Sequence, residues 1–257
     1  MLLLFPPAKI NLGLLITGKR PDGYHLLETL FLPMPELHDK MELRFAGKAG
    51  DCVLSLSGRP LEGDPEQNLV VKAYRALERH VGSLPGVAIQ LEKHIPAGAG
   101  LGGGSSNAAS LLHGMNQLCA LGLDTPTLSA LAAPLGADVP FFLYDSPMIA
   151  TGIGTELTPF ELALPYRIEL VTPPIHSSTI AAYKALDYRI FDPGRSLRDI
   201  LAKPATAWKE TLPNDLEVPV FKLHPEISRY KEDLYARGAI YAAMSGSGSA
   251  CFGLFER

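Results

Sequence analysis

Several short stretches of the chain predict β-strands, because they are either continuously apolar or alternate between hydrophobic and polar residues with a period of two. In the first half, such stretches lie at residues 2–5, 10–17, 26–32, 41–45, 53–57 and 87–92. In the second half, they lie at residues 148–150, 168–172, 239–243 and 250–255. Residues 6 and 7 are both proline and separate the first two predicted strands, because proline has no backbone donor.

An apolar period of 3.6 residues predicts a helix over residues 69–81, with Asn68 as its N-cap and Gly82 at its end. The capping role accounts for Asn68 whether or not it also binds a ligand. Further helices are predicted at residues 105–121, in a short piece from residue 126, at 178–186 and at 225–237, while residues 187–209 show a mixed pattern with short helical pieces.

Strands and helices alternate irregularly along the chain, which favours the α+β class over a doubly wound sheet. A break near residues 150–165 predicts two domains, residues 1–155 and 156–257, with a cleft between them.

The 257 residues are 47% hydrophobic and 19% charged, which is typical of a soluble globular protein. The net charge of −4 argues against a basic surface for nucleic acid, and no apolar run is long enough to span a membrane. The apolar start lacks the features of a signal peptide, and three widely spaced cysteines favour a reducing, cytoplasmic location. The seven histidines show no metal-ligand spacing, so the protein ligands of any metal are unknown.

Glycines cluster at residues 98, 100, 102, 103 and 104, between the predicted strand at 87–92 and the predicted helix at 105–121. Glycine lets the backbone turn so that several N–H groups face one point, and a helix start adds partial positive charge. Ser105 or Ser106 is placed to cap the helix. This order of strand, glycine loop and helix predicts an anion site, and a phosphate is the expected ligand.

Two alternatives to a phosphate loop stay open here. Residues 98–103 fit the G-x-G-x-x-G pattern of dinucleotide sites, which requires a second strand ending in an acid about 20 residues further on. Asp124 lies at roughly that distance, but residues 117–123 look like the end of a helix with Gly122 as its stop. A plain helix-entry turn is the second alternative, although five glycines in seven positions exceed what a turn requires. The loop is not a P-loop, because no Gly-Lys-Ser/Thr follows it.

Further positions carry candidate chemistry, and each also has a simpler structural role. Lys9, the only charge in the first eighteen residues, is either an edge-strand lysine or a cation near a phosphate or a reacting hydroxyl. Tyr24 and His25 follow a Pro-Asp-Gly turn and either pack or bind a ligand. Asp138 lies in an apolar window, where it is either an N-cap or a carboxylate that needs a cation or donors nearby.

Residues 244–249 read Met-Ser-Gly-Ser-Gly-Ser and lie between the last two predicted strands. By itself this segment is accounted for by a hairpin turn. Together with the glycine cluster, it favours a ligand with several phosphates that is held from two sides.

Three stretches resemble, in this order, the motifs of the GHMP kinases: Pro-Ala-Lys-Ile-Asn-Leu at 7–12, the glycine-rich loop at 96–109 and the serine-glycine segment at 244–249. This group includes galactokinase, homoserine kinase, mevalonate kinase and phosphomevalonate kinase. Arg-Pro-Asp-Gly-Tyr-His at 20–25 and Gly-Ala-Asp-Val-Pro-Phe-Phe at 136–142 resemble one branch of the family. That branch phosphorylates the 2-hydroxyl of a cytidine-diphospho methylerythritol in the non-mevalonate isoprenoid route.

The resemblance implies an N-terminal domain like the second domain of ribosomal protein S5 and a ferredoxin-like C-terminal domain. It implies an ATP-dependent kinase that uses Mg²⁺ and acts on a small cytidine-diphospho substrate, with no nucleic acid or membrane partner. The oligomeric state, a homodimer included, stays open.

The resemblance also implies roles for individual residues. Asp138 would be the catalytic base and Lys9 its partner. The cytosine ring would lie between Tyr24 and Tyr183, with His25 at its edge. The full set implied for substrate is Asn11, Tyr24, His25, Thr179 and Tyr183, and the set implied for ATP is Asn68, Lys93, Pro96, Ala97, Gly98, Ala99, Gly100, Leu101, Gly102, Gly103, Gly104, Ser105 and Ser106.

Two different functions stay open on the sequence. Another small-molecule kinase of the GHMP group, of the homoserine, mevalonate or galactose type, would not require Tyr24, His25 or Tyr183. A nucleotide-binding module without catalysis is the second, and the presence of both Lys9 and Asp138 counts against it.

Overall fold

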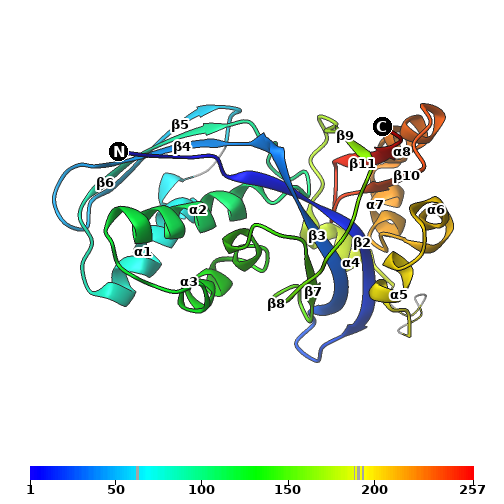
Figure 1. The fold of residues 1–257 in the computed structure, drawn as a ribbon, viewed down its shortest axis with the longest axis horizontal. Coiled ribbons are helices and arrows are strands. Elements are labelled where there is room, and N and C mark those ends of the chain that lie inside the picture. The colour runs from blue at the N-terminus through cyan, green and yellow to red at the C-terminus, as the bar shows by residue number, and fades with distance from the viewer. Residues whose placement is uncertain (62–63, 188, 190–191, 193) are drawn as a thin grey trace. The chain divides into compact units, whose positions relative to one another are not determined.

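The computed structural model describes residues 1–61, 64–187, 189, 192 and 194–257, and the chain forms two compact units (Figure 1). The first unit consists of Met1–Lys9, Pro33–Ala97 and Gly102–Asp145. The second consists of Ile10–Leu32, Gly98–Leu101 and Ser146–Arg257. These units interleave along the sequence and do not test a linear boundary, so the domain division between residues 155 and 156 stays a prediction.

The first unit is built on a four-stranded sheet in the order β1 (Leu2–Leu4), β4 (Lys40–Phe45), β6 (Val87–Lys93) and β5 (Cys52–Gly58). The pair β5–β6 is parallel, and the other pairs are antiparallel. Figure 1 shows α1 (Leu69–Val81), α2 (Gly103–Leu118) and α3 (Thr125–Ala132) on one side of this sheet. Apolar side chains of the sheet and these helices, Tyr74 and Ile89 among them, form one buried cluster.

Helix α1 confirms the sequence prediction in its bounds and in both of its caps. The Asn68 side chain accepts a hydrogen bond of 2.9 Å from the Val70 N–H, which satisfies one of the free donors at the helix start. Gly82 ends the helix in the left-handed conformation, with φ of 87°. The local sequence pattern was enough to predict this helix because its caps and its apolar face indicate the same bounds.

Helix α2 begins and ends earlier than predicted. Its N-cap is Gly102, with φ of 70° and no side-chain cap, so Ser105 and Ser106 lie inside the helix rather than at its cap. At the other end, the Asn116 side chain hydrogen bonds to both the N–H and the C=O of Leu123. This pairing draws the chain away from the helix axis after Leu118, before the predicted stop at Gly122.

The dinucleotide hypothesis for the glycine loop is wrong. Helix α3 follows α2, and no strand lies within residues 119–147, all of which the structure describes. Asp124 instead caps α3 by accepting a hydrogen bond of 2.9 Å from the Thr127 N–H. The carboxylate therefore has a local structural role in place of the ribose contact of a dinucleotide fold.

The second unit contains two sheets. One has the order β2 (Pro7–Lys19), β3 (His25–His38), β7 (Met148–Thr151), β8 (Glu156–Pro159), and its first two strands continue into the first unit. The other is antiparallel, in the order β10 (Tyr241–Met244), β11 (Cys251–Phe255), β9 (Arg167–Val171). Figure 1 shows α7 (Glu217–Leu223) and α8 (Pro225–Ala236) beside β10 and β11.

Shorter elements complete the described chain. They are α4 (Thr179–Ala185), α5 (Leu197–Leu201), α6 (Trp208–Thr211) and the 3₁₀ turns η1 (Pro65–Gln67), η2 (Ala133–Leu135), η3 (Pro140–Leu143) and η5 (Ala205–Ala207). The short helical pieces predicted within residues 187–209 are confirmed where that segment is described, and residues 188, 190–191 and 193 lie outside the described residues. The mixture of mainly antiparallel sheets with separate helices confirms the α+β class. Within the part of the chain that is described, no helix has both the length and the apolar character needed to cross a bilayer.

Candidate active site

Lys9 and Asp138 form an ion pair in the first unit, with 3.3 Å between Lys9 Nζ and Asp138 Oδ2. The lysine side chain is 3% exposed and the aspartate 34%, so the pair joins a buried ammonium to a carboxylate that solvent reaches. Asp138 is not the N-cap of η3, because Val139 holds that position. A buried ammonium needs such a partner, and Lys9 is therefore more than an edge-strand lysine.

This pair lies beside the start of α2. A Cβ atom built on Gly102 would come within 3.2 Å of Lys9 Cγ and 2.7 Å of Phe142 Cζ. The left-handed backbone of Gly102 and its missing side chain thus let the lysine stem pack against the entry to the helix. A Cβ atom built on Gly136, near Asp138 in sequence, would lie 4.0 Å from Ser105 Oγ. The first unit therefore gathers the lysine, the aspartate and the first turn of α2.

The first turn of α2 has the features of an anion site. The helix runs for 16 residues, and Gly102 supplies no side-chain acceptor to the N–H groups at its start. Those donors and the helix dipole favour a negative group. The Ser106 hydroxyl is buried there and has no hydrogen-bond partner among the described residues. A polar atom in that position suits a ligand oxygen.

Lys93 lies beneath the same helix start, where it belongs to a buried network with Asp39 and Asn107. Lys93 Nζ pairs with Asp39 Oδ2 and donates a hydrogen bond of 2.8 Å to Asn107 Oδ1. Asn107 Nδ2 donates to Asp39 Oδ2, and Asp39 Oδ1 accepts from the N–H groups of His94 and Ile95. Burial lowers the pKa of Lys93, and the neighbouring Asp39 carboxylate opposes that shift.

The network holds the end of β6 against the second turn of α2 and so supports the loop between them. Lys93 is 2% exposed and its amine already has protein partners, so its role as an ATP ligand stays a prediction. The same holds for Asn68, whose carbonyl caps α1, and for Pro96 and Ala97. Sequence reasoning missed Asp39 and Asn107. Asp39 stands alone between two strands, and nothing in the sequence pattern signals that it is fully buried.

In the second unit, the segment Gly98–Leu101 packs on the connection between β10 and β11, residues 245–250, which we call the serine-glycine loop. The Ala250 N–H donates a hydrogen bond of 3.1 Å to the Ala99 carbonyl, and Ser245 Oγ donates one of 3.0 Å to the Gly100 carbonyl. A Cβ atom on Gly100 would lie only 2.1 Å from the Ser245 carbonyl oxygen, so a glycine is required there. The two loops that the sequence singled out are therefore in contact.

The serine-glycine loop also makes the hairpin connection between antiparallel strands that the sequence predicted as its simpler role. Two of the residues implied for substrate touch it. Asn11 is 3% exposed, and its N–H donates to Ser245 Oγ at 3.2 Å, while its side chain donates to Thr29 Oγ1. Thr179 Oγ1 lies 2.7 Å from Ser247 Oγ.

His25 and Tyr183 come together in the second unit as a stacked pair, with ring centroids 5.3 Å apart and an angle of 28° between the planes. Tyr24 is 62% exposed. The pKa of His25 is lowered, mainly by burial and further by the nearby Lys19 ammonium. The ring therefore stays neutral to lower pH than a free histidine. The structure brings Tyr183 next to His25, and the cytosine position between Tyr24 and Tyr183 stays a prediction.

Among the described residues, no group of three or more His, Cys, Asp or Glu side chains could hold a metal ion. The cysteines at 52, 119 and 251 are free thiols.

Comparison with known proteins identifies the family of this chain. The family model of the GHMP kinases N terminal domain matches residues 68–146, and that of the GHMP kinases C terminal domain matches residues 197–257. A 4-diphosphocytidyl-2-C-methyl-D-erythritol kinase of Bacteroides fragilis (strain YCH46) is 48% identical over 257 residues, which cover 99% of this chain and 92% of that protein.

Two solved structures are informative as well. A crystal structure of 4-(cytidine 5'-diphospho)-2C-methyl-D-erythritol kinase has a TM-score of 0.83 at 38% identity and covers 98% of this chain and 90% of that chain. A homoserine kinase from Cytophaga hutchinsonii ATCC 33406 has a TM-score of 0.68 at 18% identity, covering 96% of this chain and 84% of that chain, and it shows the fold alone. With both family domains matched and close identity along the full length, this chain belongs to the GHMP kinase family.

Proposed function

We propose that this chain transfers the terminal phosphoryl group of ATP to the 2-hydroxyl of 4-diphosphocytidyl-2-C-methyl-D-erythritol. One observation carries the proposal: relatives 45–48% identical over essentially the whole chain are named as kinases of that compound. The Lys9–Asp138 pair beside the start of α2 gives this activity a physical basis.

Phosphoryl transfer depends mainly on positioning and on neutralising charge, because its transition state is loose. The N–H groups at the start of α2 and of the glycine segment 98–104 would hold the phosphates of ATP. Donors fixed in this way stabilise the negative charge that moves toward the leaving ADP, and they need no reorganisation during the reaction.

Asp138 would orient the acceptor hydroxyl and take its proton late in the transfer. The Asp138 carboxylate is partly exposed, so a substrate could reach it, whereas the buried Lys9 ammonium pairs with the carboxylate from the protein interior. An aspartate is a weak base for an alcohol, but a strong base is not needed because the hydroxyl proton leaves late in a loose transition state. Lys9 would also offset the negative charge that gathers near the transferred group.

ATP normally arrives with Mg²⁺, which favours phosphate oxygens, waters and one or two protein oxygens. The residues present fit such an ion. The buried Ser106 hydroxyl has no hydrogen-bond partner among the described residues and could offer one oxygen. Phosphate oxygens and waters would hold most of the ion's remaining positions, and the ion would neutralise the charge of the phosphates.

The cytidine end of the substrate is proposed to bind in the second unit. Tyr183, which stacks with His25, would cover one face of the cytosine ring, and the neutral imidazole of His25 would donate to and accept from the edge of the base. Exposed Tyr24 would cover the other face of the ring. Asn11 and Thr179 complete the proposed set.

A coupled assay of ADP release tests the proposal. The cytidine-diphospho compound is set beside galactose, homoserine and mevalonate at equal concentrations, with ATP and Mg²⁺. We expect ADP release with the first alone. Turnover of one of the other alcohols in its place would identify a different kinase of the family, and ATP binding without any turnover would identify a module without catalysis.

We also propose two domains, residues 1–155 and 156–257, and a homodimer. Limited proteolysis checks the first, with cleavage expected near residue 155. Light scattering of the purified protein checks the second, and the mass of one chain of 27.7 kDa would contradict a dimer.

A further inference from the structure

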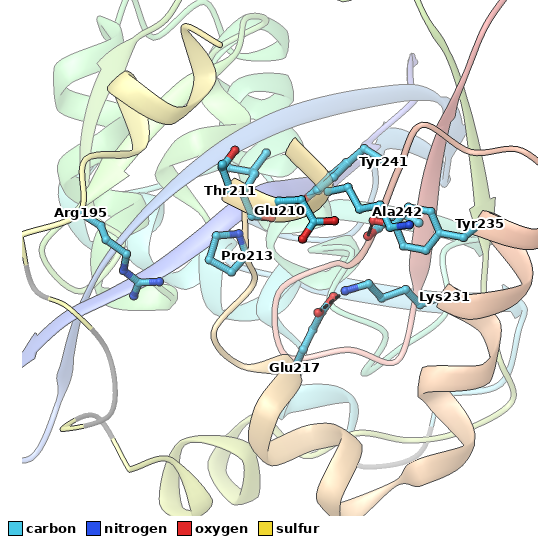
Figure 2. Close-up of a pocket in the computed structure, with 11 residues that line it drawn as sticks. Arg195, Glu210, Thr211, Pro213, Glu217, Lys231, Tyr235, Tyr241 and Ala242 are labelled. Carbon is cyan, nitrogen blue, oxygen red and sulfur yellow. Dashed lines mark hydrogen bonds and ion pairs between the residues drawn. The ribbon is translucent and has the colours of Figure 1, made fainter. Parts of the chain in front are cut away.

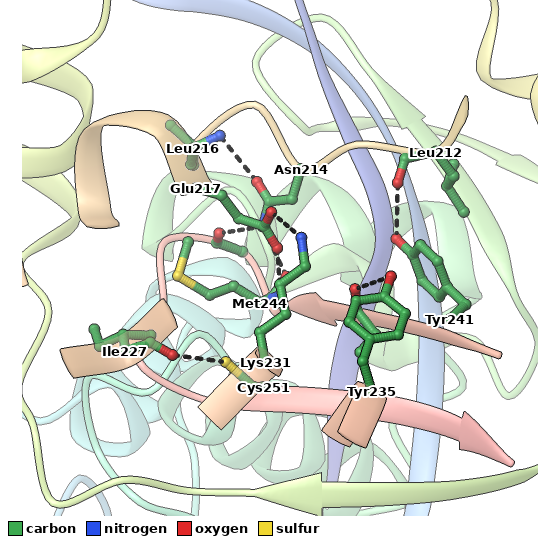
Figure 3. Close-up of polar contacts among 12 residues, drawn as sticks. Leu212, Asn214, Leu216, Glu217, Ile227, Lys231, Tyr235, Tyr241, Met244 and Cys251 are labelled. Atoms are coloured by element: carbon green, nitrogen blue, oxygen red, sulfur yellow. Dashed lines mark hydrogen bonds and ion pairs between the residues drawn. The ribbon is translucent and has the colours of Figure 1, made fainter. Parts of the chain in front are cut away.

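The serine-glycine loop is held from behind by a turn that sequence reasoning gave no role. Asn214 Nδ2 donates hydrogen bonds of 2.7 Å to the Met244 carbonyl and 2.8 Å to the Gly246 carbonyl. Glu217 Oε1 accepts a hydrogen bond of 2.8 Å from the Met244 N–H. The residue at which β10 ends is therefore held at both of its backbone groups by side chains of one turn, which Figure 3 shows converging on Met244.

The turn is itself firmly placed. Its backbone pairs in parallel with β2: the Leu14 N–H donates to the Pro213 carbonyl, and the Asp215 N–H donates to the Leu14 carbonyl. Asn214 Oδ1 accepts from the Leu216 N–H, so the oxygen and the nitrogen of this buried amide both have partners. A satisfied polar group of this kind favours one arrangement over others, because leaving any member unpaired in the interior is costly.

Glu217 is held on its other oxygen by Lys231 of α8, with 2.6 Å between Lys231 Nζ and Glu217 Oε2. Burial raises the pKa of Glu217, and the Lys231 ammonium is the chief opposing influence. The other charged or titratable groups that act on this carboxylate or line the cavity beside it are Asp215, Glu210, Lys209, Arg195, Tyr235 and Tyr241.

The Glu217–Lys231 pair lines a cavity of about 280 Å³ (Figure 2). Its other cations also have protein partners: Arg195 Nη1 donates to Asp215 Oδ1 at 3.0 Å, and Lys209 Nζ lies 4.9 Å from the centre of the Tyr235 ring. We therefore assign no ligand to the cavity.

The contacts continue from this turn to the glycine segment. Ser245 follows Met244 directly, and its hydroxyl donates to the Gly100 carbonyl while accepting from the Asn11 N–H. A shift of Met244 or Gly246 would move Ser245, and Gly100 cannot follow freely because of its close approach to the Ser245 carbonyl. The side chains of Asn214 and Glu217 are thus linked to Gly98–Leu101 through Met244 and Ser245.

We propose that Asn214 and Glu217 are positioning residues for ATP: by fixing Met244 and Gly246, they keep the serine-glycine loop and Gly98–Leu101 in the shape that receives the phosphates. This inference rests on the proposed function. Neither side chain contacts the nucleotide; each acts through the backbone it holds.

The test compares two substitutions with a matched control. Asn214→Asp keeps the size of the side chain but sets an oxygen against the two carbonyls, and we expect the Kd for ATP to rise about tenfold or more. Glu217→Gln keeps an acceptor for the Met244 N–H but loses the charge that pairs with Lys231, so a smaller rise of about threefold is expected. Tyr241→Phe removes a buried hydrogen bond to the Leu212 carbonyl in the same cavity and should leave the Kd for ATP unchanged.

Isothermal titration gives the Kd values for ATP and for the cytidine substrate, and hydrogen exchange gives the protection of residues 98–101 and 245–250 without ligand. The expected result is weaker ATP binding, a Kd for the cytidine substrate within about twofold of the original, and faster exchange in both segments. Folded Asn214→Asp and Glu217→Gln proteins with unchanged ATP binding would overturn the inference. An equal loss in Tyr241→Phe would also overturn it, because general stability would then be the cause.

Two further results of these experiments also decide the matter. If Asn214→Asp does not fold, Glu217→Gln decides the matter by its Kd for ATP and its loop exchange. If the unsubstituted protein binds no ATP, the proposed function fails; if it binds ATP and the variants bind equally well, the positioning role alone fails.

Discussion

At the scale of single residues, the Lys9–Asp138 pair joins two chain positions that lie 129 apart, and their contrast in exposure suits different roles. The buried cation pairs with the partly exposed carboxylate, which we propose to orient the acceptor hydroxyl. The sequence could name both residues because each stands as a charge in an apolar stretch. It could not reveal their distance, which only the fold supplies.

Replacing Asp138 by asparagine should slow phosphoryl transfer by about 10²–10⁴-fold, because the amide cannot accept the hydroxyl proton. ATP binding should be retained, since Asp138 lies outside the helix start that would hold the phosphates. Single-turnover kinetics measures the first effect and isothermal titration the second. Asp124→Asn, at the cap of α3, is the matched control and should transfer at the normal rate. Near-normal transfer in Asp138→Asn would remove this residue from its assigned role.

The pH dependence of substrate binding should follow His25. Its pKa lies below the ordinary 6.5 because of burial and Lys19, so the folded protein favours the neutral ring. The stability gained from the neutral ring is fully present above pH 6.5 and is lost as the pH falls through the folded pKa. We expect the KM for the cytidine substrate to be flat above pH 6.5 and to rise below it. The same rise in His25→Gln, whose amide does not titrate, would assign the effect to another group.

Asp39 illustrates what sequence could not predict at this scale. Replacing it by asparagine leaves the buried Lys93 ammonium without its carboxylate, which should cost about 3–5 kcal/mol of unfolding free energy. Urea denaturation measures this cost, and Lys93→Met with Asp39→Asn should cost less than the sum of the single changes. Additive costs would show that the two side chains do not interact.

At the scale of elements, the sequence correctly predicted those features that depend on residues close together in the chain. The bounds of α1 were predicted correctly because its caps and its apolar face coincide. The start of α2 was placed two residues late, since serines are good caps and the sequence does not show that Gly102 adopts a left-handed conformation. Strand β8 and the parallel pairing of β5 with β6 depend on partners distant in sequence and were not predicted.

Gly102→Ala tests the packing at the start of α2. The positive φ alone should cost about 1 kcal/mol, and the overlap of the new Cβ with Phe142 should add about 1–3 kcal/mol. Gly82→Ala is the matched control, because Gly82 has a similar φ and no atom near the added Cβ. Chemical denaturation gives both costs. ATP binding should weaken in Gly102→Ala alone, and equal costs with equal ATP binding would contradict the packing role.

At the scale of the whole molecule, each of the two units consists of three segments that are separated in sequence. Asn11 meets Ser245, and Gly98–Leu101 meets the serine-glycine loop, although more than a hundred residues separate each pair. The hydrophobic periodicity of a sequence does not show which distant segments come into contact. Resemblance to a family supplied the fold and the proposed roles of the site residues, whereas the sequence pattern alone supplied the α+β class and most of the elements.

The most direct test of the central claim is phosphorus NMR of a reaction that contains the protein, ATP, Mg²⁺ and 4-diphosphocytidyl-2-C-methyl-D-erythritol. We expect a new phosphomonoester signal on the methylerythritol that grows in step with ADP and is nearly abolished by Asp138→Asn. Release of inorganic phosphate without that ester, or an unchanged ATP spectrum, would contradict it.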